Sequence, residues 1–405
     1  ASYQGGTPGQ ENAVRAENPD TLSPFLLRAS YPGNGGFSLH FSEPMAAESL
    51  MDAQAYRIEP GLGILQEWYT EPPFHNELML KWEFAPSPGQ IYRIDVDGRA
   101  EDCAGNIMPS QWVRAALPSY PDSAGLVFNE LLFHPPEQGS RYIELFHNAH
   151  RVYDLKDLRI AEWDSVAGIV GTALPLSSGS FLVFPGDYVL LSSDLRGVKM
   201  HYDVPLGLCV PDMPGFPPMR VSRGGLALAD RSLSILDAMV YDEDMHHPML
   251  LSRRGVALER LNAGWSSMMP SNWHSAAGEA GFGTPGRANS QQAIAWQGGR
   301  ANFQVYPRVF SPGAGGSDEL LQIRYDLTEP GFMAHVRVFD RAGRQIRVLQ
   351  QGLLMGSSGV ITWDGLCENR LRTAPGIYLI WVSLIHPDGK LETHRLPAVL
   401  AGSRN

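Results

Sequence analysis

Short stretches of alternating apolar and polar residues recur along the chain. In FSLHFSEPM, the residues Phe37, Leu39 and Phe41 fall on one face and polar residues on the other. IYRIDVDG and HVRVFD repeat this period of two, which is typical of half-buried β-strands. GIYLIWVSLI, residues 376–385, is almost continuously apolar, which predicts a central strand buried on both faces. Because only residues 46–55 suggest a helical turn or two, the pattern predicts an all-β protein.

The strand-like stretches are grouped by linkers and by loops rich in proline and glycine, of which the chain has 31 and 42. We expect a flexible N-terminal segment at 1–18, followed by three tandem β-sandwich (Ig-like) domains at 19–118, 124–290 and 302–405. The loop VPDMPGFPPM, residues 210–219, is long for a compact domain and is a candidate binding loop.

Charge and cysteine usage exclude several classes of function. The 405 residues carry a formal net charge of −11, and no basic run or amphipathic basic helix is present, so we expect neither nucleic-acid nor membrane-surface binding. Cys103, Cys209 and Cys367 allow at most one disulfide and form no zinc motif, so no cofactor is predicted. No apolar run reaches the ~20 residues that span a bilayer. The chain starts at Ala1, as a processed exported protein or a trimmed chain would.

The middle block resembles the lamin-tail domain of secreted bacterial proteins. The resemblance rests on NELLFHPPEQGSRYIELFHNAHRVYDLKDLRI, on YDEDMHHPMLLSRRGVALERLN and on the closing segment NWHSAAGEAGFGTPGRANSQ. The positions that carry it are Asn129, Glu130, Tyr142, Glu144, Leu145 and Asn148. It covers about 165 residues and implies a further Ig-like sandwich.

The flanking blocks resemble two other kinds of module. LHFSEPM, YRIDVDG and DCAGNIM are similar to a bacterial Ig-like module of surface-layer and secreted proteins. VRVFDRAGRQIRVL, TWDG and APGIYLIWV resemble the C-terminal Ig-like module of hook-capping and gliding-type proteins. Modules of that general kind serve as export and anchoring signals in type IX secretion of Bacteroidota. The resemblance therefore implies an extracellular or cell-surface protein associated with the outer membrane.

Residues 272–291, NWHSAAGEAGFGTPGRANSQ, bring together residue types found in hydrolase sites. His274 and Ser275 are neighbours, and Glu279 follows four residues later. Adjacent residues of an extended chain point to opposite sides, and a catalytic triad needs groups that converge from distant segments. No GxSxG motif is present either. We therefore interpret this segment as a strap that closes a domain, with Trp273 and Phe282 filling the edge of a core.

The best metal candidate is the stretch DEDMHH, which offers Asp242, Asp244, His246 and His247 as candidate ligands, with Glu243 between them. Adjacent histidines rarely bind one ion together, so a polar surface turn is the favoured interpretation. DVDGRAED lacks the spacing of a calcium loop because Gly98 comes too early, and a hairpin turn is expected there.

Two further sets of residues are candidates for chemistry or binding. Glu130 and Glu144 could pair as in a glycosidase, but a carboxylate in an alternating strand more often faces solvent or accepts backbone hydrogen bonds. Ligand or partner contacts are predicted at Trp68, Trp82, Met213 and Phe216, although core packing is the alternative for each.

These observations favour a protein that is not an enzyme. We expect a modular extracellular or cell-surface adhesin, scaffold or subunit of a surface assembly, exported by a type IX-like route. Its partners would be other cell-surface or outer-membrane proteins, the secretion machinery through the C-terminal domain, and a possible glycan. Two alternatives remain: a carbohydrate- or peptide-binding accessory protein of an outer-membrane system, and a metal-dependent hydrolase.

Overall fold

The structure is a computed structural model, which describes residues 20–292, 300–312 and 318–402. The predicted flexible segment at 1–18 lies outside them. The described chain is nearly all β, which confirms the predicted class. It forms two compact units, one with the described residues up to Ser119 together with Ser180–Leu182, and one with the remainder. No helix in the described part of the chain is long and apolar enough to span a membrane.

The first unit is a sandwich of two antiparallel sheets. The larger sheet has the order β1-β2-β5-β4, formed by Leu26–Ser30, Phe37–Phe41, Glu77–Trp82 and Leu65–Thr70. The smaller has the order β3-β6-β7, formed by Tyr56–Glu59, Ile91–Val96 and Gln111–Ala116. The helical turns predicted within 46–55 are present as η1 (Ala47–Leu50) and η2 (Ala53–Ala55).

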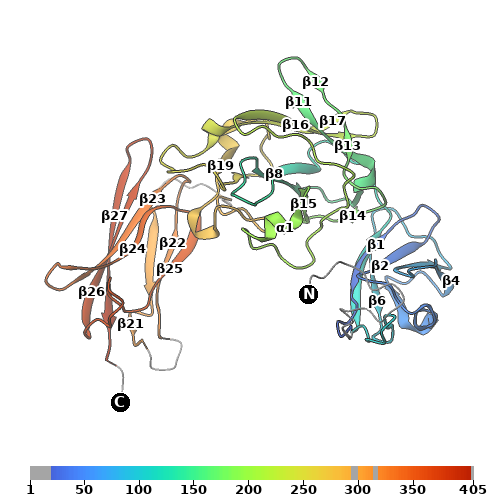
Figure 1. The fold of residues 1–405 in the computed structure, drawn as a ribbon, viewed down its shortest axis with the longest axis horizontal. Coiled ribbons are helices and arrows are strands. Elements are labelled where there is room, and N and C mark those ends of the chain that lie inside the picture. The colour runs from blue at the N-terminus through green and yellow to red at the C-terminus, as the bar shows by residue number, and fades with distance from the viewer. Residues whose placement is uncertain (1–19, 293–299, 313–317, 403–405) are drawn as a thin grey trace, which may run out of the picture. The chain divides into compact units, whose positions relative to one another are not determined.

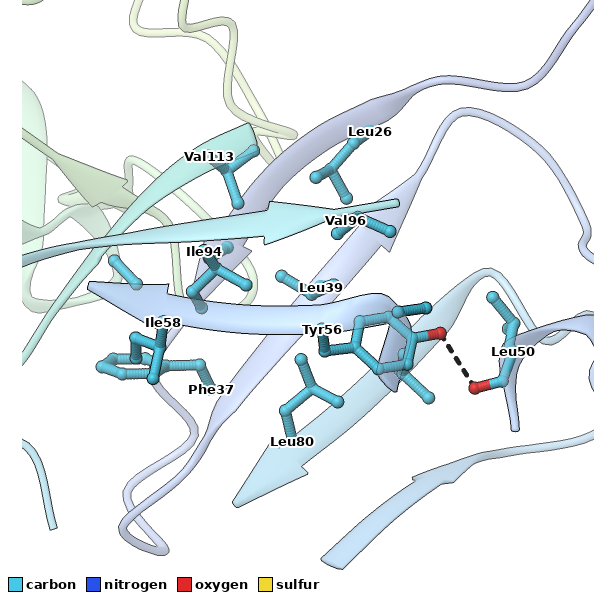
Figure 2. Close-up of a cluster of buried hydrophobic side chains, with 14 of the residues drawn as sticks. Leu26, Phe37, Leu39, Leu50, Tyr56, Ile58, Leu80, Ile94, Val96 and Val113 are labelled. Atoms are coloured by element: carbon cyan, nitrogen blue, oxygen red, sulfur yellow. Dashed lines mark hydrogen bonds between the residues drawn. The ribbon is translucent and has the colours of Figure 1, made fainter. Parts of the chain in front are cut away.

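Alternation along these strands explains the core of the first unit. Phe37, Leu39 and Ile94 come from facing sheets and are fully buried between them (Figure 2). The hydroxyl of Tyr56 donates to the carbonyl of Leu50 at 2.8 Å, which satisfies the polar end of a buried aromatic side chain (Figure 2). The predicted hairpin turn at Asp97-Gly98 is instead one bend in the long connection between β6 and β7, because β7 begins only at Gln111.

The middle part of the chain, within the second unit, carries two larger sheets and a two-stranded pair. One sheet has the order β15-β9-β8-β18-β19, formed by Tyr188–Ser192, Tyr142–His147, Leu126–Leu132, Leu258–Arg260 and Trp273–Ser275. The other has the order β12-β11-β16-β17 with β13 beside β11, formed by Ile169–Val170, Leu158–Asp164, Arg223–Asp230, Ile235–Asp242 and Leu174–Pro175. The pair is β10 (Tyr153–Asp154) with β14 (Leu182–Val183).

Helical segments in this middle part are short. They are α1 (Leu195–Lys199), η3 (Leu155–Asp157), η4 (Glu243–Met245), η5 (Pro270–Asn272) and η6 (Gly278–Ala280). Strand β8 is buried at all seven positions, so it is the centre of this module.

The C-terminal part of the second unit is a sandwich of a three-stranded and a five-stranded sheet (Figure 1). The first has the order β20-β22-β25, formed by Asn302–Tyr306, Leu321–Asp326 and Ser358–Trp363. The second has the order β21-β27-β26-β23-β24, formed by Val309–Phe310, Leu391–Leu400, Gly376–Ile385, Met333–Asp340 and Gln345–Leu354.

Strand β26 differs from its prediction. It is central, but only every second residue is buried, and Ile377 on the opposite face is 62% exposed. A second sheet covers one face of β26 with a hydrophobic core, whereas apolar side chains on the other face remain accessible. The sheets of the described chain form three sets, and each set lies within one of the predicted domains 19–118, 124–290 and 302–405. That each set is a separate domain remains a prediction.

Candidate functional site

Three glutamates form a row across three neighbouring strands of the middle module. Glu144 on β9 is the direct cross-strand partner of Glu130 on β8, and Glu130 is the partner of Glu259 on β18. All three side chains are completely buried. Because this arrangement gathers three carboxylates in a dry core, it is the most unusual chemical feature of the described chain.

The row is closed by the segment Thr284–Gln291, which we call the strap. The strap presents hydrogen-bond donors to each carboxylate in turn. Thr284 N–H donates to Glu130 Oε1 at 2.9 Å, and the N–H of Gly286 donates to Glu144 Oε2. Gln291 N–H donates to Glu259 Oε2 at 2.9 Å. The glutamate side chains therefore hold the strap by accepting hydrogen bonds from its backbone. The strap in turn covers them, which leaves no free face for a substrate.

Side chains complete the bonding of the row. Tyr142 donates its hydroxyl to Glu130 Oε1 at 2.7 Å, and Ser290 donates to Glu259 Oε2 at 2.7 Å. The Thr284 hydroxyl lies 2.7 Å from Glu259 Oε1 and 3.3 Å from Glu130 Oε2. Since this hydroxyl has one hydrogen, the chain is complete when Glu130 is protonated and donates to Thr284, which donates to Glu259.

The electrostatics of the row agree with that proton. Burial, reinforced by the charge of Glu259, raises the pKa of Glu130 to about 8. Burial also raises the pKa of Glu144 and of Glu259 above their ordinary values. No cation is among the main causes of these pKa shifts, and Arg260, next to Glu259 in the sequence, donates to the carbonyl of Phe128 at 2.8 Å. Burial without a counter-ion favours the protonated carboxyl group, and Glu130 is the member of the row whose hydrogen bonds call for that proton.

Two glycines, Gly283 directly before the strap and Gly286 within it, are required by close approach. A Cβ on Gly283 would lie 2.7 Å from the hydroxyl oxygen of Tyr142, and one on Gly286 would lie 2.8 Å from Leu208. Gly286 also has a φ of +81°, a conformation that L side chains rarely adopt. The sequence GTPG is therefore explained by the backbone path over the row.

The strap region also bonds to the C-terminal module of the same unit. The side-chain amide of Gln291 donates to Ser275 O at 3.0 Å and to Met355 O at 3.1 Å. Ser290 O accepts from Ser357 N, and Glu279 Oε1 accepts from Gly356 N at 2.9 Å. One short segment thus joins the glutamate row of one module to the turn between β24 and β25 of the next.

His274, Ser275 and Glu279 do not form a catalytic triad. Ser275 Oγ lies 3.0 Å from Nδ1 of His246, not of His274. Both members of that pair are buried, and no hydrogen-bond partner orients Nε2 of His246. A nucleophile needs access to substrate and an oriented base. These bonds fit the interpretation of residues 272–291 as a segment that closes the module.

The candidate metal ligands are already engaged elsewhere. His247 donates from Nε2 to Gly331 O at 3.0 Å and accepts from Met249 N at Nδ1. Asp242 caps η4 by accepting from Asp244 N, and the Asp244 carboxylate pairs with Arg253. The predicted ligands therefore do not converge on one ion.

One other group of side chains in the described part of the chain has metal-ligand spacing. It consists of Asp20, Glu43 and Asp102 in the first unit. Both Asp102 oxygens already accept hydrogen bonds, from Ala104 N and from the Asn106 side chain among others. The sequence analysis did not identify this group, because its three members are far apart along the chain.

Of the four residues predicted to contact a ligand or partner, the two tryptophans pack in or against the core of the first unit. Trp82 is 4% exposed and belongs to the core, so its ring is out of reach of a ligand. Trp68 packs against that core and donates from Nε1 to Met51 O at 3.0 Å. Met213 and Phe216 are half-buried in a loop whose Met219 is buried in its own module.

Sequence reasoning missed Trp112, which is 52% exposed on the outer face of β7. It borders a hollow of about 460 Å³ that Arg57, Asp95 and Ser110 also line. The guanidinium of Arg93 lies 4.8 Å from its ring centroid. The alternation in QWVRAA could have found it, because Trp112 and Val113 must face opposite sides.

Comparison with known proteins does not establish a family. No family model matches the chain, and no curated protein matches it. A DUF4876 family protein from Bacteroides thetaiotaomicron is 11% identical over 50% of this chain and 82% of its own, with a TM-score of 0.24. The S-layer protein rSbsC is 10% identical over 94% of this chain and 54% of its own, with a TM-score of 0.23.

A third similar structure is PorZ, a surface component of the type IX secretion system of Porphyromonas gingivalis. It is 12% identical over 93% of this chain and 51% of its own, with a TM-score of 0.19. The chain thus spans about half the length of two of these structures. TM-scores this low establish neither a common overall fold nor a common activity, and the lamin-tail resemblance remains a prediction.

Proposed function

We propose that this chain is a non-catalytic modular protein of the cell surface, acting as a scaffold, adhesin or subunit of a surface assembly. The observation that carries the proposal is the strap. Of the residues that most resemble a hydrolase site, Ser275 is buried, and the segment that contains them fastens one β module to the next through Gln291 and Glu279. A segment used in this way maintains the relative position of two sandwiches and leaves loops and outer sheet faces for binding.

The extracellular location and a type IX-like export route belong to the same proposal. They are supported by the sequence resemblances of the middle and C-terminal blocks. An acidic chain of net charge −11 with little lysine suits a soluble surface component that avoids anionic membranes.

Protease treatment of intact producing cells tests the location. We expect the chain to be digested from outside while a cytoplasmic control protein persists. A chain that is protected in intact cells but digested after lysis would contradict the proposal.

A second experiment tests the proposal that the protein is not an enzyme. The purified chain is assayed with glycosidase, peptidase, phosphatase and nuclease substrates in the presence of divalent metals. Turnover that is lost in Glu130→Gln would contradict it.

A carbohydrate-binding role is the second candidate, and the hollow beside Trp112 favours it. An exposed indole next to guanidinium and carboxylate groups offers a stacking surface together with donors and acceptors for hydroxyl groups. On a glycan array we expect any specific binding to be lost in Trp112→Ala and kept in Trp265→Ala, which removes an exposed tryptophan elsewhere. If the parent chain, Trp112→Ala and Trp265→Ala all bound equally, the hollow beside Trp112 would be excluded as the glycan-binding site.

A further inference from the structure

The outer face of the five-stranded sheet in the C-terminal module combines basic and apolar side chains. Its inner face packs on the module's core. The residues that alternate outward from β23, β26 and β27 we call the basic face: His335, Arg337, Phe339, Ile377, Leu379, Trp381, Ser383, Thr393, Arg395 and Pro397.

Strand register aligns these residues in rows. Trp381 on β26 is the direct partner of Arg337 on β23 and of Arg395 on β27. The guanidinium of Arg395 lies 4.6 Å from the centre of the indole ring. An exposed arginine thus lies on each side of one half-buried tryptophan.

The next row is apolar. Leu379 is the partner of Phe339 on one side and of Pro397 on the other. Ile377 extends this surface, and its side chain is 62% exposed. Accessible apolar residues in adjacent rows are typical of a surface that another molecule covers.

No carboxylate faces outward from these three strands. Their two acidic residues are Asp340 and Glu392. Asp340 accepts from Arg344 in the following turn, whereas Glu392 is buried and pairs with Lys390.

The neighbouring strand β24 contains no acidic residue. The two carboxylates bonded to it belong to Glu368 and Asp364, which bind the N–H of Val348 and the guanidinium of Arg347. The basic face therefore carries uncompensated positive charge on a chain whose net charge is −11.

We propose that the basic face docks a protein partner that presents an acidic, partly apolar surface. Charge complementarity selects an acidic partner for the row of Arg337 and Arg395. The adjacent row of Phe339, Leu379 and Pro397 selects a protein over a polyanionic glycan, because a glycan would leave that apolar area uncovered. Tryptophan and arginine at the centre of such a patch are the residue types that contribute most to binding between proteins.

This inference rests on the proposed role as a subunit of a surface assembly and names the surface that such a role would use. The test begins with a photo-crosslinking residue, p-benzoylphenylalanine, in place of Thr393 on the basic face of the full chain. A matched chain carries it at Thr362, an exposed position on the other sheet of the same module, and a third carries it at Ile64 in the first unit. Producing cells are irradiated, and the adducts are identified by mass spectrometry.

We expect an adduct with an acidic protein from Thr393 and not from Thr362. That protein is then purified, and its affinity for the full chain is measured. Arg337→Glu and Arg395→Glu should each weaken binding roughly tenfold. Arg324→Glu should leave it unchanged, since this control removes an exposed arginine of the other sheet, whose guanidinium lies 5.5 Å from the ring centre of Tyr306. Thermal unfolding confirms that each variant is folded.

Four results would overturn the proposal. These are an adduct with a glycan, an adduct with a second copy of this chain, binding that is insensitive to both charge reversals, and no adduct from Thr393. If adducts form from Ile64 but not from Thr393, the basic face is not the docking surface, while the proposed role in a surface assembly stands. If none of the three positions gives an adduct, and the chain is also protected from protease on intact cells, the proposed function fails as well.

Discussion

Glu130 and Glu259 lie directly opposite each other on neighbouring strands, fully buried, with the hydroxyl of Thr284 between them. Two adjacent carboxylates in a dry core repel each other if both are ionised. The strap supplies the hydrogen that joins them, so closure of the strap and the protonation state of the row depend on each other.

Removing the linking hydroxyl should therefore destabilise the second unit. Thr284→Val keeps the shape of the side chain but leaves Glu259 Oε1 without its donor. We expect a loss of about 2–3 kcal/mol in the free energy of unfolding, since a buried charged acceptor loses its partner. Thr362→Val, an exposed threonine on β25, is the control and should change stability by less than about 0.5 kcal/mol. Equal effects in urea titrations would contradict a special role for Thr284.

The three glutamates should make stability fall as pH rises. Their pKa values are raised in the folded chain, so the folded state binds more protons than the unfolded state above pH 4.5. Stability is then greatest below the unfolded pKa and decreases as pH rises through the folded pKa, which for Glu130 is about 8. The slope is ~1.4 kcal/mol per pH unit for each proton involved.

Two amide substitutions separate the roles within the row. Glu130→Gln places an N–H group where a protonated Glu130 donates, toward Thr284, so it should fold well and flatten the slope between pH 5 and 8. Glu259 accepts from Thr284, Ser290 and Gln291. In Glu259→Gln, the side-chain NH2 group would therefore face hydrogen-bond donors instead of acceptors. This variant should destabilise the chain at every pH. Chemical denaturation across pH measures both variants, and identical behaviour would disprove the assigned proton.

Local patterns predicted some of these features and not others. The alternation in FSLHFSEPM gives β2, and the closing segment is recognisable as a strap from its glycines and its lack of a convergent triad. The sequence suggested a pairing of Glu130 with Glu144 but not the addition of Glu259, because the three residues meet only through the registers of three strands, and register depends on pairing between distant segments. Of the two alternatives for Glu144, facing solvent or accepting backbone hydrogen bonds, the structure shows the second.

The continuous apolar run of β26 was misleading for another physical reason. A strand in which both faces are apolar is usually covered on both sides, but Ile377, Leu379 and Trp381 face outward from the sandwich. An apolar sequence pattern predicts which residues favour burial, but it does not predict which part of the protein, or which partner, covers them. The difference between the expected and observed burial of β26 is what identifies the basic face.

Acidification should destabilise the histidine-containing contact between β19, η4 and the C-terminal module. Burial lowers the pKa of His246 and of His274 to about 4. The groups near His246 are Ser275, Phe133, Arg253, His134 and His274. Since the folded pKa lies below the ordinary 6.5, this stability is present above pH 6.5 and is lost as pH falls toward 4.

Replacing one histidine should reduce that loss. His246→Asn keeps a polar group beside Ser275 but does not titrate, so stability should fall less between pH 7.5 and 5 than in the parent chain. His150→Asn removes an exposed histidine and should leave the pH dependence unchanged. Guanidinium unfolding at the two pH values gives the comparison, and parallel behaviour of all three chains would exclude His246 as the titrating group.

Gln291 should determine whether the two modules of the second unit unfold together. Its amide bonds to Ser275 O on one side and Met355 O on the other, within a buried junction. Gln291→Ala leaves both carbonyls without this donor and should cost about 1–3 kcal/mol. Because the lost bonds connect the modules, calorimetry should resolve the unfolding of the second unit into two transitions. The neighbouring Gln292 is exposed, so Gln292→Ala should preserve the parent profile, and a single unchanged transition in Gln291→Ala would show that the junction does not depend on the strap.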